Sequence, residues 1–445
     1  MSATLNEIRD CLDGEIPGVI STCALDGTPN CSYVSQVHFI DGMHVALSFQ
    51  FFNKTRENVL ANPLAAALVI HPLSAARYCL RLHYLRTETE GPVFESMKAK
   101  LAGIASHTGM SGVFRLQGAD IYRVTQVLTI AGPVVPHAPP RNLLPAVRSY
   151  LQAAARYSEL SLLLEGTLAQ VEMLFGVPHS MIHWLDDAGE RLYLVASRGY
   201  AQSGVGSEIQ VGQGLIGAAA RARTAIRVKH ATAEFTYNHA ARESVRQSHL
   251  ADRLEAEVPL PGLARPGSQL AVPIAARGRL LGVLYLETEE ELAFGYDEED
   301  AFVAVADHLA LTAQLLGQAA ERVEEPPRAP PGPPATEGRV AVIRHYAADD
   351  TVFIDDGYLI KGVAGAILWK LLGEFQQTGR QEFTNRELRL DSTLPLPELS
   401  SNLEARLILL QRRLAERCAF VALEKAGRGR LKLRVTRPLR LVESA

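Results

Sequence analysis

One run of the sequence, residues 46–63 (ALSFQFFNKTRENVLANP), carries the residue types that hold a phosphate group. Its polar side chains are Ser48, Gln50, Asn53, Lys54, Thr55, Arg56 and Asn58. A phosphate needs cationic partners and several hydrogen-bond donors gathered in one place. The pattern predicts a strand that leads directly into a helix, whose first N–H groups add further donors. A solvated helix start after an edge strand fits the same residues, so both interpretations stay open.

Three histidines, His71, His83 and His107, are candidates for haem ligation. Imidazole is a common axial ligand of haem iron. It is equally common as a hydrogen-bonded polar residue on a strand. Haem b therefore stays an alternative that the spacing does not decide.

The last part of the chain is basic and rich in arginine. Residues 339–445 contain 18 Lys and Arg against 13 Asp and Glu, although the whole chain has a net charge of -4. This asymmetry is in the direction expected of a nucleic-acid module. The candidate DNA contacts are Arg406, Arg412, Arg413 and Arg417 on a predicted helix, and Arg428 and Arg430 in a predicted hairpin. Leucines at helical spacing separate the first four, which would then equally be the solvated face of a core helix.

Proline-rich segments divide the chain into three units. Residues 324–338 contain six prolines and predict an extended linker, and residues 131–142 mark a second boundary. We therefore expect units at 1–135, 143–320 and 339–445. Short strands with tight turns at 26–30 and 40–43 indicate a small barrel in the first unit. One strand is expected over residues 31–40.

The second unit predicts a long helix over 148–175, then strands, then an acidic-started helix near its end. The strands are expected to form an antiparallel sheet with helices outside it. The third unit predicts helices over 363–379 and 400–418 and a hairpin over 420–435 that turns at 427–430.

Residues 1–130 resemble the pyridoxamine-phosphate-oxidase-like flavin-binding split barrels, most closely over SYVSQVHFIDGMHVALSFQFFNKTRENVLANPLAAALVI. The resemblance implies a homodimer with flavin, either FMN or FAD, at the subunit interface. Lys54, Thr55 and Asn58 match the phosphate positions, while Val34, Ser35, Gln36 and Ser48 match positions near the flavin ring. Gln50 and Asn53 are added as candidates from the same run. Some members of the family bind haem, and the substrate-phosphate site of the vitamin B6 oxidases is not found here.

Residues 143–320 resemble a GAF domain through VGQGLIGAAARARTAIRVKH, GSQLAVPIAARGRLLGVLYLE and FGYDEEDAFVAVADHLALTAQ. The resemblance implies a small ligand or a dimerisation platform. No cysteine lies between Cys79 and Cys418, which excludes a covalently held bilin. His239 and His249 fall in a segment that is better explained as a solvated helix than as a cofactor contact.

Residues 339–445 resemble the winged-helix domain of OmpR-type response regulators, with NLEARLILLQRRLAER as the groove-reading helix and AGRGRLKLRV as the wing. The fold class expected for the whole chain is therefore multidomain α+β: a split β-barrel, a GAF α/β sheet domain and a winged-helix-like domain.

The cysteine content, the hydropathy pattern and the absence of several motifs exclude some classes of function. Five cysteines without a CxxC pair are typical of reduced thiols in the cytoplasm, and no apolar run approaches the roughly 18 residues of a membrane span. Metalloprotease, Walker, EF-hand and zinc-finger motifs are absent.

Three functions remain. The first is a flavin-binding redox protein, acting as an oxidoreductase or oxidase. It becomes a flavocytochrome if haem near the flavin passes electrons to dioxygen, and a small redox protein or a nicotinamide would be the donor. The second is a redox- or ligand-sensing transcription regulator that binds DNA. The third is an interaction scaffold with empty pockets.

Overall fold

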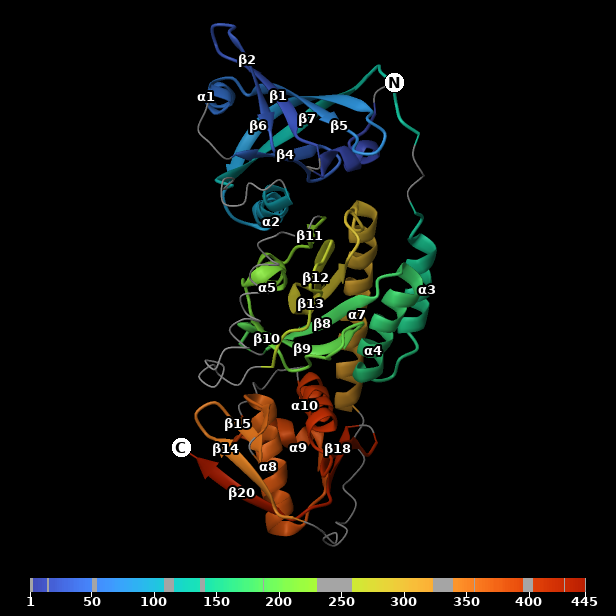
Figure 1. Cartoon of the computed structure of the whole chain (residues 1–445), viewed down its shortest axis with the longest axis vertical. Helices are drawn as coiled ribbons and strands as arrows, with labels where there is room; N and C mark the ends of the chain where they lie inside the picture. Colours follow the sequence, from blue (N-terminus) through green and yellow to red (C-terminus); the bar gives the residue numbers. More distant parts are fainter. Residues whose placement is uncertain are drawn as a thin grey trace.

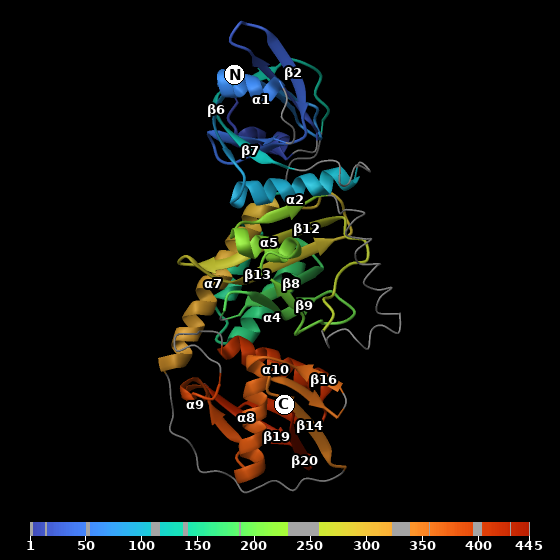
Figure 2. The same ribbon diagram turned by 90° about the vertical axis from the view of Figure 1, so that its left-hand side faces the viewer.

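The computed structural model describes residues 3–13, 16–49, 54–107, 116–136, 141–186, 188–229, 258–322, 339–355, 357–394, 403–427 and 429–444. Side chains are described for the same residues except 99, 101–107, 318–322 and 444. Three folded units follow one another along the long axis of the molecule, with the N-terminal unit at one end and the C-terminal unit at the other (Figures 1 and 2).

The N-terminal unit, called the barrel below, is one antiparallel sheet in the order β2-β1-β5-β6-β7-β4-β3. Its strands are β1 (Gly18–Cys23), β2 (Pro29–Val34), β3 (Val37–Phe39), β4 (His44–Phe49), β5 (Leu64–Ile70), β6 (Arg77–Glu88) and β7 (Gly118–Ile130). Its helices are η1 (Asn6–Leu12), α1 (Lys54–Ala61) and α2 (Pro92–His107). The single strand expected over 31–40 is divided into β2 and β3, with Ser35 and Gln36 between them.

Strand β4 shows why its sequence is apolar without a break. Val45 and Leu47 point into the main core of the barrel. Ala46 lies on the opposite face and packs in a second core with Phe94 and Met97 of α2. Because successive side chains of a strand alternate between faces, a strand buried on both faces reads as a continuous apolar run.

The middle unit is a six-stranded antiparallel sheet in the order β10-β9-β8-β13-β12-β11. Helices α3, α4 and α7 cover one face, where Leu164, Leu284 and Phe302 lie in one core. Helix α5 covers the other face, where Ile216 and Val283 share a second core. The prediction of helices outside an antiparallel sheet is confirmed.

The elements of the middle unit are α3 (Leu144–Ala154), α4 (Leu160–Gln170), η2 (Val171–Phe175), β8 (His179–Leu185), β9 (Arg191–Arg198), β10 (Glu208–Gln210), α5 (Gly214–Ala222), β11 (Ile226–Val228), β12 (Ser268–Ala276), β13 (Arg279–Thr288) and α7 (Tyr296–Arg322).

The prediction of one long helix over 148–175 is wrong, because α3 ends and α4 starts anew within it. Glu159 has the extended backbone angles φ -138 and ψ 141, which interrupt the helix. Tyr157 then lies across Gly166 of α4, where a Cβ atom would stand 2.1 Å from the tyrosine hydroxyl oxygen. Only glycine permits this close approach, and no local periodicity announces it.

The third unit contains two sheets, β16-β15-β14-β20 and β17-β19-β18. Its elements are β14 (Ala341–Tyr346), β15 (Thr351–Ile354), β16 (Gly357–Ile360), α8 (Val363–Thr378), β17 (Glu382–Thr384), α9 (Asn385–Leu390), α10 (Leu403–Arg417), β18 (Val421–Lys425), β19 (Arg430–Val435) and β20 (Leu439–Ser444). The two predicted helices and the hairpin are confirmed, whereas the three strands before α8 were not predicted. Helix α10 lies against the middle unit, because Ala405 and Ile408 join the core of that unit.

Candidate functional site

The barrel contains a cavity of about 660 Å³, called the barrel pocket. This is within the usual range for ligand sites, roughly 300–1,000 Å³. Val34, Leu47, Phe49 and Tyr122 form much of its apolar wall. The polar side chains in its lining are Ser32, Ser35, Ser48, Thr55, Arg56 and Asp120. The pocket therefore combines an apolar wall with one cation, one carboxylate and several hydroxyl groups.

Arg56 is the cation of the barrel pocket. Its guanidinium group forms an ion pair with Asp120 and donates to Thr87 Oγ1 at 2.8 Å. It also lies over the ring of Phe49, with 4.4 Å from Cζ to the ring centroid. Burial and the Asp120 carboxylate raise the pKa of Tyr122, so its phenol stays protonated at neutral pH.

A network of hydrogen bonds surrounds Thr55 at the start of α1. Thr55 Oγ1 accepts a hydrogen bond from Asn30 Nδ2 at 2.8 Å and lies 2.7 Å from Ser32 Oγ. Asn58 is buried one turn later and donates to Thr22 Oγ1 at 3.1 Å. These contacts hold the N-terminus of α1 against β1 and β2, so that Thr55 and Arg56 face the pocket.

The structure places the predicted flavin residues unequally. Val34, Ser35, Ser48 and Thr55 line the barrel pocket, whereas Asn58 is buried behind it. The Lys54 side chain is 56% exposed and pairs with Glu57 at 3.1 Å, outside the lining. Gln50 and Asn53 lie outside the described residues.

Gln36 is the predicted flavin residue with the most unusual surroundings. Its backbone bonds to Ser48, through Ser48 N–H to Gln36 O at 3.0 Å and Gln36 N–H to Ser48 Oγ at 3.2 Å. Its side chain is fully buried, and neither amide atom has a hydrogen-bond partner in the described part of the chain. Gln36 is not among the residues that line the barrel pocket, unlike its neighbour Ser35.

Asp120 lines this site although the sequence did not predict it, and Arg56 lines it without having been among the predicted flavin contacts. Arg56 had a signal, since it belongs to the polar run 46–63. Asp120 had none, because it lies 64 positions from Arg56 on β7, where strand pairing with β4 brings it to the pocket.

The haem candidates are placed apart from this pocket's lining. His71 accepts the backbone N–H groups of Leu73 and Ser74 at its Nδ1 atom, at 3.3 and 3.1 Å. Its Nε2 atom lies 3.7 Å from Asp10. His83 is half-buried on β6, and the side chain of His107 lies outside the described side chains. Within the described ranges, no three His, Cys, Asp or Glu residues are grouped as a metal site would need.

The sheet of the middle unit carries a buried polar cluster of Gln269, Tyr285 and Glu287. Gln269 Nε2 donates to the Tyr285 hydroxyl at 2.7 Å, and that hydroxyl donates to Glu287 at 3.1 Å. The other Glu287 oxygen accepts the N–H of Leu263 at 2.9 Å. His183 is also fully buried, without a described partner at either ring nitrogen, and burial lowers its pKa to about 3. His239 and His249 fall outside the described residues.

The DNA-contact candidates on α10 face protein. Arg412 donates to the carbonyl oxygen of Val195 and to Glu165 at 2.7 Å, both in the middle unit. Arg406 lies over the ring of Tyr193, with 4.4 Å from Cζ to the ring centroid. In this arrangement that face of α10 is closed to DNA.

The remaining DNA-contact candidates differ from one another in how exposed their side chains are. Arg413 is 2% exposed and donates to the carbonyl oxygen of Leu359 at 3.0 Å. Arg417 is exposed at the end of α10, and Arg430 is half-buried in the hairpin. Arg428 lies outside the described residues.

None of the described helices is both long and apolar enough to cross a membrane.

Two family models match separate parts of the chain. Residues 4–118 match the family described as pyridoxamine 5'-phosphate oxidase, and residues 159–313 match the GAF domain. The chain therefore contains a pyridoxamine-phosphate-oxidase-like domain followed by a GAF domain. No curated protein matches the sequence.

Solved structures similar to this chain include three that each cover one unit. The GAF domain of an Acinetobacter phosphoenolpyruvate-protein phosphotransferase is 22% identical over 42% of this chain and 99% of its own, with a TM-score of 0.31. The free methionine-R-sulfoxide reductase of Neisseria meningitidis is 17% identical over 42% and 98%, with a TM-score of 0.31. An FMN-binding protein from Syntrophomonas wolfei is 16% identical over 29% and 87%, with a TM-score of 0.25.

Proposed function

We propose that the protein is a flavin-binding redox protein whose GAF domain senses a small ligand. The observation that carries the first half is the barrel pocket, which joins a flat apolar wall to Arg56 and Thr55 inside the oxidase-like domain. A flavin has the matching parts, an apolar ring with polar edges and a phosphate tail. When bound, it would supply electron transfer in steps of one or two electrons.

The residues present fit such a cofactor. Arg56, Thr55 and Ser32 would hold the phosphate, since a guanidinium and two hydroxyls converge there. Lys54 would add charge from the rim, and Asn58 would position the helix start through Thr22. Val34, Leu47 and Tyr122 would cover the ring, with Ser35 and Ser48 at its edge.

We further propose that a second copy of the chain covers the barrel pocket. Tyr33 lines the pocket yet is 83% exposed, and Leu25 in the turn between β1 and β2 and Leu64 at the start of β5 are 79% and 61% exposed. Exposed apolar side chains gathered in one region are typical of a protein interface. Sedimentation of the holoprotein should show a dimer that Tyr33→Arg weakens, and an unchanged monomer in both would contradict this part.

The GAF half of the proposal is supported by the polar cluster around Glu287. The carboxylate is fully buried, and its described partners are a phenol and a backbone N–H rather than a cation. A buried carboxylate without a cation is costly unless its surroundings or a ligand compensate it. A small polar ligand that donates hydrogen bonds would meet this need.

The test begins with the absorption spectrum of the purified protein and chromatography of the released cofactor. FMN titration then compares Arg56→Ala with Arg86→Ala, a matched arginine whose described partner is the half-buried Glu88 on the same barrel. Loss of a charged hydrogen bond is worth about 1.5–3 kcal/mol, so Arg56→Ala should weaken FMN binding roughly 10- to 100-fold. Lys54→Ala should act less strongly.

The outcome also separates the cofactors. Equal FMN affinity in Arg56→Ala and Arg86→Ala would overturn the phosphate assignment. A sharp Soret band would add haem b and the flavocytochrome with dioxygen as acceptor, although both His71 nitrogens already face protein groups. Oxygen consumption with a nicotinamide or a reduced small redox protein as donor would be measured next.

DNA binding is the second candidate, and one observation favours it. The order helix, short strand, helix, helix and hairpin from α8 to β19 is the order expected of a winged helix. Because Arg406 and Arg412 contact the middle unit, DNA would have to compete with those contacts. A promoter-region shift with steep salt dependence would support this candidate, and no shift in either redox state would remove it.

A further inference from the structure

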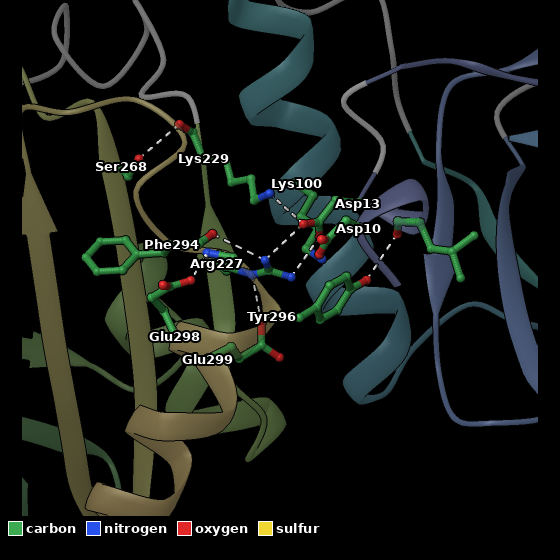
Figure 3. A network of polar contacts seen from close by, with 12 residues as sticks. Asp10, Asp13, Lys100, Arg227, Lys229, Ser268, Phe294, Tyr296, Glu298 and Glu299 are labelled. Carbon is green, nitrogen blue, oxygen red and sulfur yellow. Dashed lines mark hydrogen bonds and ion pairs between the residues drawn. The ribbon is translucent and has the colours of Figure 1, made fainter. Parts of the chain in front are cut away.

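The barrel and the middle unit meet through one small set of elements. On the barrel side these are η1, the residue Asp13 that follows it, and α2. On the middle side they are β11 and the first turn of α7, as Figures 2 and 3 show. The two units thus share a short contact between identifiable side chains, of which Asp13 and Arg227 lie 214 positions apart in the sequence.

Asp13 is the centre of this contact. Its side chain is 1% exposed and forms ion pairs with three cations from both units. Arg227 of β11 approaches to 2.7 Å and binds both carboxylate oxygens. Lys229 approaches to 2.6 Å and Lys100 of α2 to 3.2 Å. We call Asp13, Lys100, Arg227, Lys229 and Glu299 the Asp13 cluster (Figure 3).

A second layer of contacts holds Arg227 in place. Its Nε donates to Glu299 at 2.8 Å and its Nη1 to the Phe294 carbonyl oxygen at 3.2 Å. Its guanidinium carbon lies 4.2 Å from the centroid of the Tyr296 ring. The Tyr296 hydroxyl donates to the carbonyl oxygen of Leu12 in the barrel, at 3.0 Å. Arg227 is fully buried, so all of this recognition is shielded from water.

The cluster contains one more cation than carboxylates. Three cations face two carboxylates, and the neighbouring His38 lies 3.4 Å from Lys100 with its pKa held down by burial and by that lysine. Removal of one partner from a buried ion pair leaves a charge without compensation, which is strongly unfavourable. Loss of Asp13 would therefore leave three cations without their shared carboxylate.

The cluster also lies between the two candidate ligand regions. Asp13 is separated by two residues from Ile16, which lines the barrel pocket together with Pro17. On the other side, Ile226 next to Arg227 belongs to the core beneath α5, on the sheet face that also carries Tyr285.

We propose that the Asp13 cluster couples the barrel pocket to the GAF domain. The conformational state of the GAF domain would then set the flavin affinity of the barrel. This inference rests on the proposed flavin site and names its regulation. Coupling between sites requires an element with two arrangements that both sites bias. The ion pairs that Asp13 makes with Lys100 of the barrel and with Arg227 and Lys229 of the middle unit would supply such an element.

The test uses the full-length holoprotein and two neighbouring positions of α7. Glu299→Gln removes the half-buried carboxylate that accepts from Arg227 Nε. Asp300→Asn is the matched control, because Asp300 is 63% exposed and pairs with Arg9 at the rim of the same contact. Neither residue lines the barrel pocket. We expect Glu299→Gln to weaken FMN binding at least five-fold, within the usual range of coupling energies, and Asp300→Asn to leave it unchanged.

Calorimetry provides a readout that does not depend on flavin. The barrel and the middle unit should unfold in one transition in the wild type and in Asp300→Asn, but in two in Glu299→Gln. Lys229→Met serves as a second variant if Glu299→Gln fails to fold. An unchanged FMN affinity and a single shared transition in both cluster variants would overturn the inference. Wild-type protein that binds no FMN would refute the proposed function instead, while the calorimetric result would still decide whether the cluster couples the units.

Discussion

The middle unit is held from two sides, and the two contacts differ in kind. On the barrel side, Asp13 and Arg227 are 1% and 0% exposed and both are fully enclosed by partners. On the other side, Arg412 at 20% exposure pairs with Glu165 at 62%, and Lys425 pairs with Glu159 at 39% and 37%. Exposed ion pairs contribute about 0–1 kcal/mol, whereas breaking a buried pair costs roughly 3–5 kcal/mol.

The difference suggests a division of roles. A contact built on buried charges holds two domains in a fixed relative position. It also transmits a structural change from either domain to the other. The contact with the third unit combines exposed pairs with the Lys361–Glu208 pair, at 18% and 14% exposure, and with Ala405 and Ile408 as its apolar part. We expect it to separate more easily, because it has no ion pair as fully buried as that of Asp13 and Arg227 among the described residues. The barrel and GAF domain should therefore behave as one cooperative body, and the third unit as a more independent one.

The Asp13→Asn substitution should have the largest effect on the free energy of unfolding. It leaves Lys100, Arg227 and Lys229 without their shared carboxylate, so we expect a loss of about 3–5 kcal/mol in the free energy of unfolding. Urea denaturation, followed by a probe in the barrel, would measure it. Asp10→Asn is the matched control, since Asp10 is 57% exposed, and equal stability of the two variants would refute the role given to the cluster.

The pH dependence of the buried contact gives a smaller effect. Burial and Arg227 lower the pKa of Lys100 to about 8 from its ordinary 10.5. Between these two values the unfolded chain binds the proton that the folded chain has released, so folding stability rises with pH there. The contribution of Lys100 should rise by at most roughly 1.4 kcal/mol per pH unit.

Lys100→Met should abolish this rise, and Lys98→Met should keep it, because Lys98 is 56% exposed on the same helix. The measurement is the unfolding free energy of each variant relative to the wild type at pH 8 and pH 10. A parallel pH profile for wild type and Lys100→Met would contradict the assignment.

The smallest effect on stability is expected at the contact between the middle and third units. Glu165→Gln removes the exposed partner of Arg412 but leaves the Val195 carbonyl oxygen as an acceptor. We expect a loss of less than about 1 kcal/mol, seen only in the unfolding transition of the third unit. A loss as large as that of Asp13→Asn would show that the two contacts are alike.

The sequence predicted much of what is local. Ser48 and Thr55 were grouped from a single run of residues, and the structure places both on the wall of one cavity. The hairpin of β18 and β19 followed from strand-forming residues around a glycine-containing turn, and its antiparallel pairing is observed. Such features depend on residues a few positions apart, whose physical preferences can be read directly.

The arginines of α10 show what local sequence preferences do not predict, which is the partner of an exposed-looking side chain. Arg406 and Arg412 look alike in sequence whether they meet DNA, solvent or another domain, and the structure turns both toward the middle unit. Arg412 lies 247 positions from Glu165 along the chain. Periodicity assigns a helix and its buried stripe, but it does not identify what covers the opposite stripe.

The sequence by itself thus determined the first two domains, many of the helices and strands, and the polar run beside the barrel pocket. Only the tertiary structure decided that Asp120 completes the charge of that pocket and that Asp13 meets Arg227 across 214 positions. The physical reason is that the sequence around a charged residue does not indicate which distant residue it will pair with. Its pairing is decided by which surfaces the packed cores bring together, and by how much water those surfaces exclude.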